Sequence, residues 1–187
     1  MIADSSSMII LAKLNRLYIL LKLYKEILIT QGIYKETVEE GIAINAPDAK
    51  LIEKAVQINE IKIVELNSKY VKFSDELKET YVQLGIGESD AIALALQEKQ
   101  KRIIIDEKSG RQICKLYKIK SIGTLRVILE AYEKNIIKEQ ELKDIIKEII
   151  ESKFRIGADV ITEFWNVFEK LKKKKKKRTN PLALDPP

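Results

Sequence analysis

Short apolar runs that alternate with helical segments constrain the fold of this chain more than any other feature. The runs "EILIT" (residues 26–30), "IKIVEL" (61–66) and "RIIID" (102–106) are rich in Ile, Leu and Val, and each has the length of a buried strand. We expect a very short strand at residues 2–4 and another within "KSIGT" at 120–124. Strands that alternate with helices favour a three-layer α/β fold, in which a parallel sheet has helices on both faces.

The amino-acid composition excludes several classes of active site. The 187 residues include no histidine and a single cysteine, Cys114. Ser-His-Asp triads and zinc sites built from histidine or several cysteines are therefore excluded. An enzyme of this composition has to work with carboxylates, lysines or a hard metal ion. We expect Cys114 to be a buried thiol, because it lies within an amphipathic helical pattern.

The net charge of +6 comes from the C-terminal end of the sequence. The segment "KKKKKKR" (172–178) carries seven positive charges, and without residues 172–187 the basic and acidic residues are equal in number. We expect residues 1–155 to form the main domain, 156–171 to form an amphipathic helix on the core or on a dimer partner, and 172–187 to be a disordered tail. No apolar run approaches the roughly 20 residues of a membrane span, and no signal peptide is recognisable, so a cytoplasmic protein is expected.

Acidic residues stand at the ends of two expected strands and at the start of one helix. Asp4 ends the first strand, Asp106 ends "RIIID", and Glu88 and Asp90 open the helix within "GIGESDAIALALQE". Sites in parallel sheets lie outside the carboxyl ends of the strands, so these side chains are expected to share a cleft. Two carboxylates 4 Å apart repel by about 4 kcal/mol at an effective dielectric constant near 20. Bound Mg²⁺ or Mn²⁺ offsets that repulsion and prefers oxygen ligands.

Each acid also has a structural interpretation. Asp4 fits a helix N-cap, Glu88 and Asp90 fit the positive end of a helix dipole, and Asp106 with Glu107 fits a turn. The sequence leaves these alternatives open for each residue taken singly. Together they explain less well why acids end two strands that are expected to be buried.

The order of these motifs resembles that of the PIN domain, a metal-dependent nuclease fold that includes the VapC-type toxins. The matching segments are "IADSSS", "ILITQGIYKETV", "GIGESDAIALAL", "RIIIDEKSGR" and "SIGTLRVILEAYEKNII". The resemblance implies a parallel sheet of about five strands, a Mg²⁺ or Mn²⁺ site and single-stranded RNA as substrate. It also implies a homodimer and a protein antitoxin as partner.

The resemblance carries roles over to particular residues. The catalytic acids implied are Asp4, Glu36, Asp90 and Asp106. The residues implied around the metal are Asp4, Asp90, Asp106, Glu107 and Glu88, with Glu36 and Glu88 holding metal-bound water. The substrate-binding residues implied are Ser6, Lys13 and Arg111. Typical members have Thr-Asn-Asp where this chain has Ile-Asp-Glu, which leaves both Asp106 and Glu107 as the fourth acid, and Glu39 and Glu40 remain alternatives to Glu36.

The function predicted from these features is a metal-dependent endoribonuclease, the toxin of a toxin–antitoxin pair. The alternative is a PIN-like binding module without a functional metal site, which the Ile-Asp-Glu departure favours. A phosphotransfer domain of the receiver type requires an Asp at the end of the third strand, and Glu65 at that place counts against it.

Overall fold

A computed structural model describes residues 1–152 and 156–179, with side chains described up to residue 176. The chain forms two compact units, Met1–Val127 and Ile128–Pro187, and each is described by itself. Within the described ranges, no helix combines the length and the apolar character that crossing a bilayer requires.

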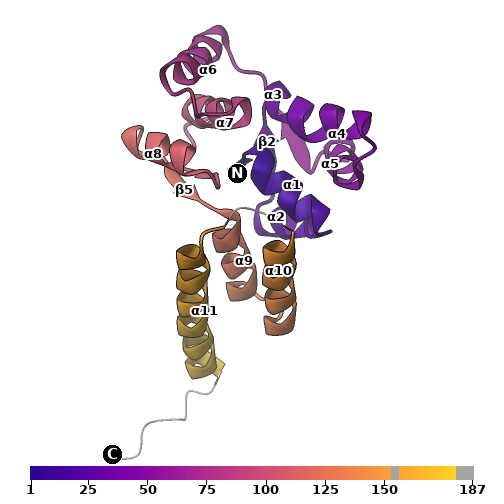
Figure 1. Cartoon of the computed structure of the whole chain (residues 1–187), viewed down its shortest axis with the longest axis vertical. Coiled ribbons are helices and arrows are strands. Elements are labelled where there is room, and N and C mark those ends of the chain that lie inside the picture. The colour runs from indigo at the N-terminus through magenta and orange to yellow at the C-terminus, as the bar shows by residue number, and fades with distance from the viewer. Residues whose placement is uncertain (153–155, 180–187) are drawn as a thin grey trace, which may run out of the picture. The chain divides into compact units, whose positions relative to one another are not determined.

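A five-stranded parallel sheet organises the first unit (Figure 1). Its strands are β1 (Ile2–Ala3), β2 (Ile27–Ile29), β3 (Ile61–Ile63), β4 (Arg102–Ile104) and β5 (Lys120–Ile122). The spatial order is β3-β2-β1-β4-β5, and every neighbouring pair is parallel. The predicted α/β class and the parallel sheet are thus confirmed. The strand order reverses between β1 and β4, which is the position where parallel sheets open a crevice at their carboxyl ends.

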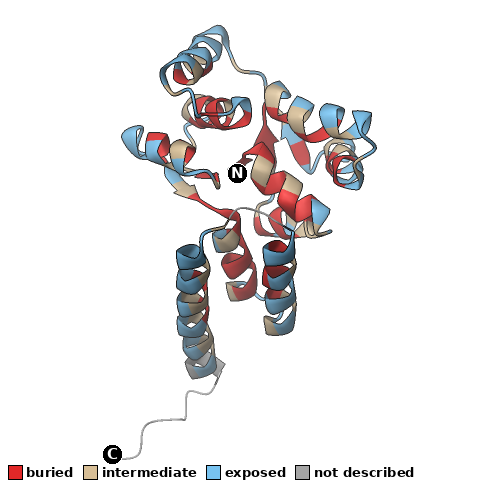
Figure 2. Cartoon of the chain, viewed as in Figure 1, coloured by how far each residue is buried: buried red, intermediate tan, exposed pale blue. Residues whose placement is uncertain are grey.

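The central strands are buried on both faces of the sheet. Successive side chains of a strand point to opposite faces, and Ile2 and Ala3 of β1 are both fully buried. The three residues of β2 and the last two of β4 are buried as well, which explains why these strands read as continuous apolar runs rather than alternating ones (Figure 2).

Nine helical segments of the first unit connect and cover these strands. They are α1 (Ser5–Lys13), α2 (Tyr18–Leu23), α3 (Gln31–Tyr34), the π-helix η1 (Lys35–Glu39), α4 (Glu40–Ala43), α5 (Pro47–Gln57), α6 (Ser68–Thr80), α7 (Ile86–Gln97) and α8 (Lys108–Leu116). Helix α7 is the most apolar of the site-forming helices, with eight buried residues and direct packing on β1 and β4. Its first turn therefore lies close to the ends of the two strands that carry Asp4 and Asp106.

Three helices follow the sheet. Helix α9 (Thr124–Glu133) crosses the boundary between the units, and α10 (Glu139–Glu151) and α11 (Ala158–Thr179) belong to the second unit. The first compact unit ends at Val127, within α9.

Residues 172–179 continue α11, whereas the sequence predicted disorder from residue 172 onward. Lysine is a good helix former, and Lys172 and Lys175 bind partners on the preceding helices, which stabilises the helical conformation. Residues 180–187 of the predicted tail lie outside the described residues.

Candidate active site

Asp4 lies at the carboxyl end of β1 and is almost completely buried. Its backbone N–H extends the sheet by donating to Ile104 O (3.0 Å), and its side chain caps α1 by accepting from Ser7 N at 2.9 Å. The hydroxyl of Ser6 donates to the other carboxylate oxygen at 2.9 Å. Burial, together with the neighbouring charge of Asp106, raises the pKa of Asp4 to about 6 despite these hydrogen bonds. The capping interpretation and the functional one therefore apply to the same side chain.

Asp106 follows β4 and faces the same end of the sheet. Its carboxylate accepts hydrogen bonds from Thr124 N (2.9 Å), Thr124 Oγ1 (2.5 Å) and Ser7 Oγ (3.0 Å). Arg111 Nη2 lies 3.8 Å from Asp106 Oδ1, and Arg111 Nε donates to Ile105 O at 2.9 Å. The hydrogen bond to Ile105 O thus holds the guanidinium of Arg111, a predicted substrate-binding residue, beside Asp106.

Glu88 in the first turn of α7 has one carboxylate oxygen that caps its helix and one that has no partner. Oε2 accepts from Gly85 N at 2.7 Å, while Oε1 is buried without a hydrogen bond to any described residue. Burial raises the pKa of Glu88 to about 7, and the charges of Asp4, Glu107 and Glu36 add to the increase. A buried acceptor without a donor is costly, so this oxygen is available as a ligand for a cation.

Glu36 joins the group from the π-helix η1. Its carboxylate accepts a hydrogen bond from Ser5 Oγ. Gly87 packs against this pair so closely that a Cβ would lie 2.5 Å from Ser5 Oγ and 2.6 Å from Glu36 Oε2. The alternatives Glu39 and Glu40 are exposed, which favours Glu36 as the acid of this helix.

Asp90, which the sequence predicted as a metal ligand, accepts hydrogen bonds from two hydroxyl groups of other elements. Thr30 Oγ1 donates to its Oδ2 at 2.8 Å, and Ser74 Oγ donates to its Oδ1 at 2.6 Å. Residues two positions apart on a helix point in nearly opposite directions, so Glu88 and Asp90 of α7 face different surroundings. Asp90 borders a separate hollow of about 380 Å³ with Gln31 and Lys78.

The remaining predicted residues, Glu107 and Lys13, are both exposed. Glu107 is exposed at the N-cap of α8, and its charge raises the pKa of Glu88. Lys13 is exposed in the last turn of α1, about 12 Å along the helix from Ser5 at the rise of 1.5 Å per residue. Lys13 is therefore not brought to the acids.

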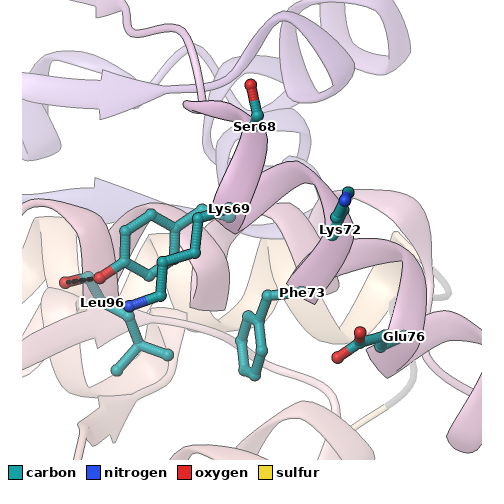
Figure 3. A pocket seen from close by; sticks show the side chains of 7 residues that line it. Ser68, Lys69, Lys72, Phe73, Glu76 and Leu96 are labelled. Carbon is teal, nitrogen blue, oxygen red and sulfur yellow. Dashed lines mark hydrogen bonds between the residues drawn. The ribbon is translucent and has the colours of Figure 1, made fainter.

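A hollow of about 660 Å³ lies along α6, away from the acids (Figure 3). Its lining residues are Ser68, Lys69, Tyr70, Lys72, Phe73 and Glu76, with Leu96 of α7. Tyr70 Oη donates to Leu96 O at 3.4 Å, and Phe73 packs edge-on against Tyr117 at 5.1 Å between ring centroids. The hollow is larger than the one beside Asp90, yet none of the predicted catalytic acids lines it.

A family profile described as a PIN domain matches residues 1–170 of this chain. The chain belongs to the PIN-domain family. Membership indicates nuclease activity, which agrees with the resemblance in the order of motifs. No curated protein matches the chain.

PIN domains use divalent metal ions, and the cleft has a donor set of the matching type. Asp4, Asp106 and Glu88 offer carboxylate oxygens, as Mg²⁺ and Mn²⁺ prefer, and Glu88 Oε1 has no competing donor. Within residues 1–152 and 156–179, no three acidic or thiol side chains come close enough to enclose an ion by themselves. Mg²⁺ usually keeps several waters and few protein ligands, so the carboxylates fit such an ion with water as the remaining ligands.

Sequence reasoning missed the hydroxyl groups that position the acids. Ser7 and Thr124 fix Asp106, Ser5 binds Glu36, and Thr30 with Ser74 occupies Asp90. The triplet Ser5-Ser6-Ser7 directly after Asp4 was the available signal, because three hydroxyls at a helix start exceed what one N-cap requires.

Proposed function

We propose that this PIN-domain protein is a metal-dependent endoribonuclease that hydrolyses phosphodiester bonds of single-stranded RNA. The observation that carries the proposal is the group formed by Asp4, Asp106 and Glu88, which are coupled electrostatically and lie outside the carboxyl ends of β1 and β4. Carboxylates brought together in a buried cleft are unfavourable without a cation, and Glu88 Oε1 has no other partner among the described residues.

Asp4, Asp106 and Glu88 would hold Mg²⁺ or Mn²⁺ in this cleft. When bound, such an ion lowers the pKa of water and offsets the charge that develops on the phosphate. Ser6 keeps Asp4 oriented through its 2.9 Å hydrogen bond. Arg111, anchored on Ile105 O, directs its guanidinium towards the same end of the sheet, where it binds a phosphate oxygen of the substrate.

Calorimetric titration of Mn²⁺ into the wild type, Asp4→Asn and Asp90→Asn proteins tests the proposed site. We expect Asp4→Asn to abolish binding, and Asp90→Asn to retain it because Asp90 is not among the acids whose charges raise the pKa values of Asp4 and Glu88. An RNase assay on a labelled single-stranded RNA, with the DNA of the same sequence beside it, tests the substrate. Equal Mn²⁺ binding by Asp4→Asn and the wild type refutes the site, and cleavage of DNA alone refutes the substrate.

A binding module without catalysis is the second candidate function. Among residues 1–152 and 156–179, no three acidic or thiol side chains are grouped closely enough to hold an ion by themselves, which favours this alternative. Under this alternative the protein binds RNA but does not cleave it, and titration with Mn²⁺ produces no heat of binding. The same titration therefore separates the two functions.

We also propose that the nuclease is a homodimeric toxin with a protein antitoxin, as the resemblance to VapC-type sequences supports. Expression of the wild-type chain is then expected to arrest growth, whereas Asp4→Asn is not. Sedimentation equilibrium of the purified chain measures whether it is a dimer. Normal growth during accumulation of folded wild-type protein contradicts the toxin role without affecting the assignment of the metal site.

A further inference from the structure

The lysine run of α11 remains outside the proposed active site and has a distinct organisation of its own. Six of the seven residues from Lys170 to Lys176 are lysines, and the only interruption is Leu171. This segment is helical and belongs to the second unit. A helix places residues i, i+3, i+4 and i+7 on one face, so the lysines divide between two faces.

The inner face of α11 packs on the unit's other helices. Phe164 and Phe168 are buried, and the ring of Phe168 lies 5.1 Å from that of Tyr132. Lys172 and Lys175 continue this face, four and seven residues after Phe168.

Both of these lysines bind groups of the second unit. Lys172 Nζ lies 2.6 Å from Glu139 Oε1. Lys175 Nζ donates to Asn135 Oδ1 at 2.7 Å and lies 4.1 Å from the ring centroid of Tyr132. These two lysines are therefore part of the folded structure and are not free to bind a ligand.

The outer face of α11 carries Lys170, Lys173 and Lys174, at positions i, i+3 and i+4. All three side chains are exposed, and none forms a hydrogen bond or ion pair with a residue whose side chain the structure describes. Like charges at this spacing repel each other. The packing of the opposite face keeps these three lysines together on the surface of α11.

We propose that the outer face of Lys170, Lys173 and Lys174 binds the phosphates of single-stranded RNA and so holds the substrate of the nuclease. The inference rests on the proposed function for the choice of RNA as the polyanion. Charge complementarity supports it, because three adjacent ammonium groups match consecutive phosphates and release their counterions. An anionic membrane is a poorer partner, because a membrane-bound helix inserts its apolar face and that face of α11 is already covered within the unit.

The test compares two triple variants of the full chain that lose the same charge. One carries Lys170→Gln, Lys173→Gln and Lys174→Gln. The control carries Lys50→Gln, Lys54→Gln and Lys99→Gln, which replace three exposed lysines of the first unit. Fluorescence anisotropy with a labelled single-stranded RNA in EDTA measures the affinity without cleavage, over a series of salt concentrations.

We expect the slope of log K against log salt concentration to fall by about 2 in the outer-face variant, at about 0.7 per phosphate contact on single strands. Between about 50 and 200 mM salt the wild type then loses about 20-fold more affinity than this variant. A third variant with arginine at the three positions is expected to keep the wild-type slope, because it keeps the charge.

An unchanged slope in the outer-face variant overturns the proposal, as does an equal change in the control variant. Binding to anionic vesicles through the same lysines, without binding to RNA, overturns it in favour of a membrane surface. Circular dichroism of each variant verifies folding. The Asp4→Asn protein is expected to bind RNA normally in EDTA, so failure of the metal site and failure of the outer face are distinguishable.

Discussion

Replacing Glu88 by glutamine is the sharpest test of the buried acidic cleft. Glutamine keeps the shape of the side chain, and its carbonyl oxygen can still accept from Gly85 N. The substitution removes the negative charge of a carboxyl group whose pKa is raised from 4.5 to about 7, chiefly by burial, and places an amide NH2 group where Oε1 was. An acid whose pKa is raised in the folded state keeps its proton to a higher pH in the folded protein than in the unfolded one. Its presence therefore makes the protein less stable as the pH rises from about 4.5 to about 7.

The magnitude follows from the same pKa. Ionising Glu88 in the folded state costs at most about 3 kcal/mol, and we expect screening by solvent to leave about 2 kcal/mol of this cost. Without divalent metal, Glu88→Gln is thus expected to increase the free energy of unfolding by about 2 kcal/mol at about pH 8 and to change it little below about pH 4.5. In the variant the free energy of unfolding still decreases somewhat as the pH rises, because the pKa of Asp4 is raised as well.

Urea unfolding followed by far-UV circular dichroism in EDTA measures this difference at the two pH values. Mn²⁺ at about 100 times its Kd is expected to stabilise the wild type by about 2.7 kcal/mol, and the variant by much less. A Glu88→Gln protein that is less stable than the wild type at about pH 8 in EDTA refutes the reasoning. It would mean that Glu88 Oε1 is satisfied by a favourable partner in the folded protein.

Three further perturbations test other parts of the structure. Gly87→Ala is expected to lower the free energy of unfolding by about 1–3 kcal/mol in urea titrations, because its Cβ overlaps Ser5 and Glu36; a gain in stability contradicts the close packing. Cys114 is buried with its pKa raised to about 12, so iodoacetamide at about pH 8 is expected to label it only in denaturant. Phe168→Ala is expected to destabilise the second unit by about 3–5 kcal/mol. The fluorescence of Trp165, whose ring centroid lies 5.7 Å from that of Phe168, reports its unfolding in urea. An unchanged midpoint of this unfolding transition contradicts the packing of Phe168.

The sheet and the acids at its strand ends were predictable because both depend on local sequence. An apolar run followed at once by an acid fixes where a side chain leaves a buried strand, and Asp4 and Asp106 both do so. The choice between Glu88 and Asp90 was not predictable in this way. Both lie on α7, and which one faces the cleft depends on hydroxyls that the fold brings from distant elements to Asp90, those of Thr30 and Ser74.

Two other features escaped sequence reasoning because they depend on backbone geometry and tertiary contacts. Glu36, Glu39 and Glu40 share a face in an α-helix, but Glu36 and Glu39 lie in the π-helix η1, in which the turn is wider and that spacing no longer applies, and Glu40 begins α4. The lysine run had the composition of a disordered tail. Its helix is stabilised by Lys172 and Lys175, whose partners lie more than 30 residues earlier in the chain.

The strand order determines when the cleft is assembled during synthesis. Ser7 of the helix that Asp4 caps donates to Asp106, which lies 99 residues further along the chain. Pairing of β1 with β4 requires closure of this long loop, a slow type of folding step. Asp4 and Asp106 therefore cannot come together until the chain has been translated as far as β4.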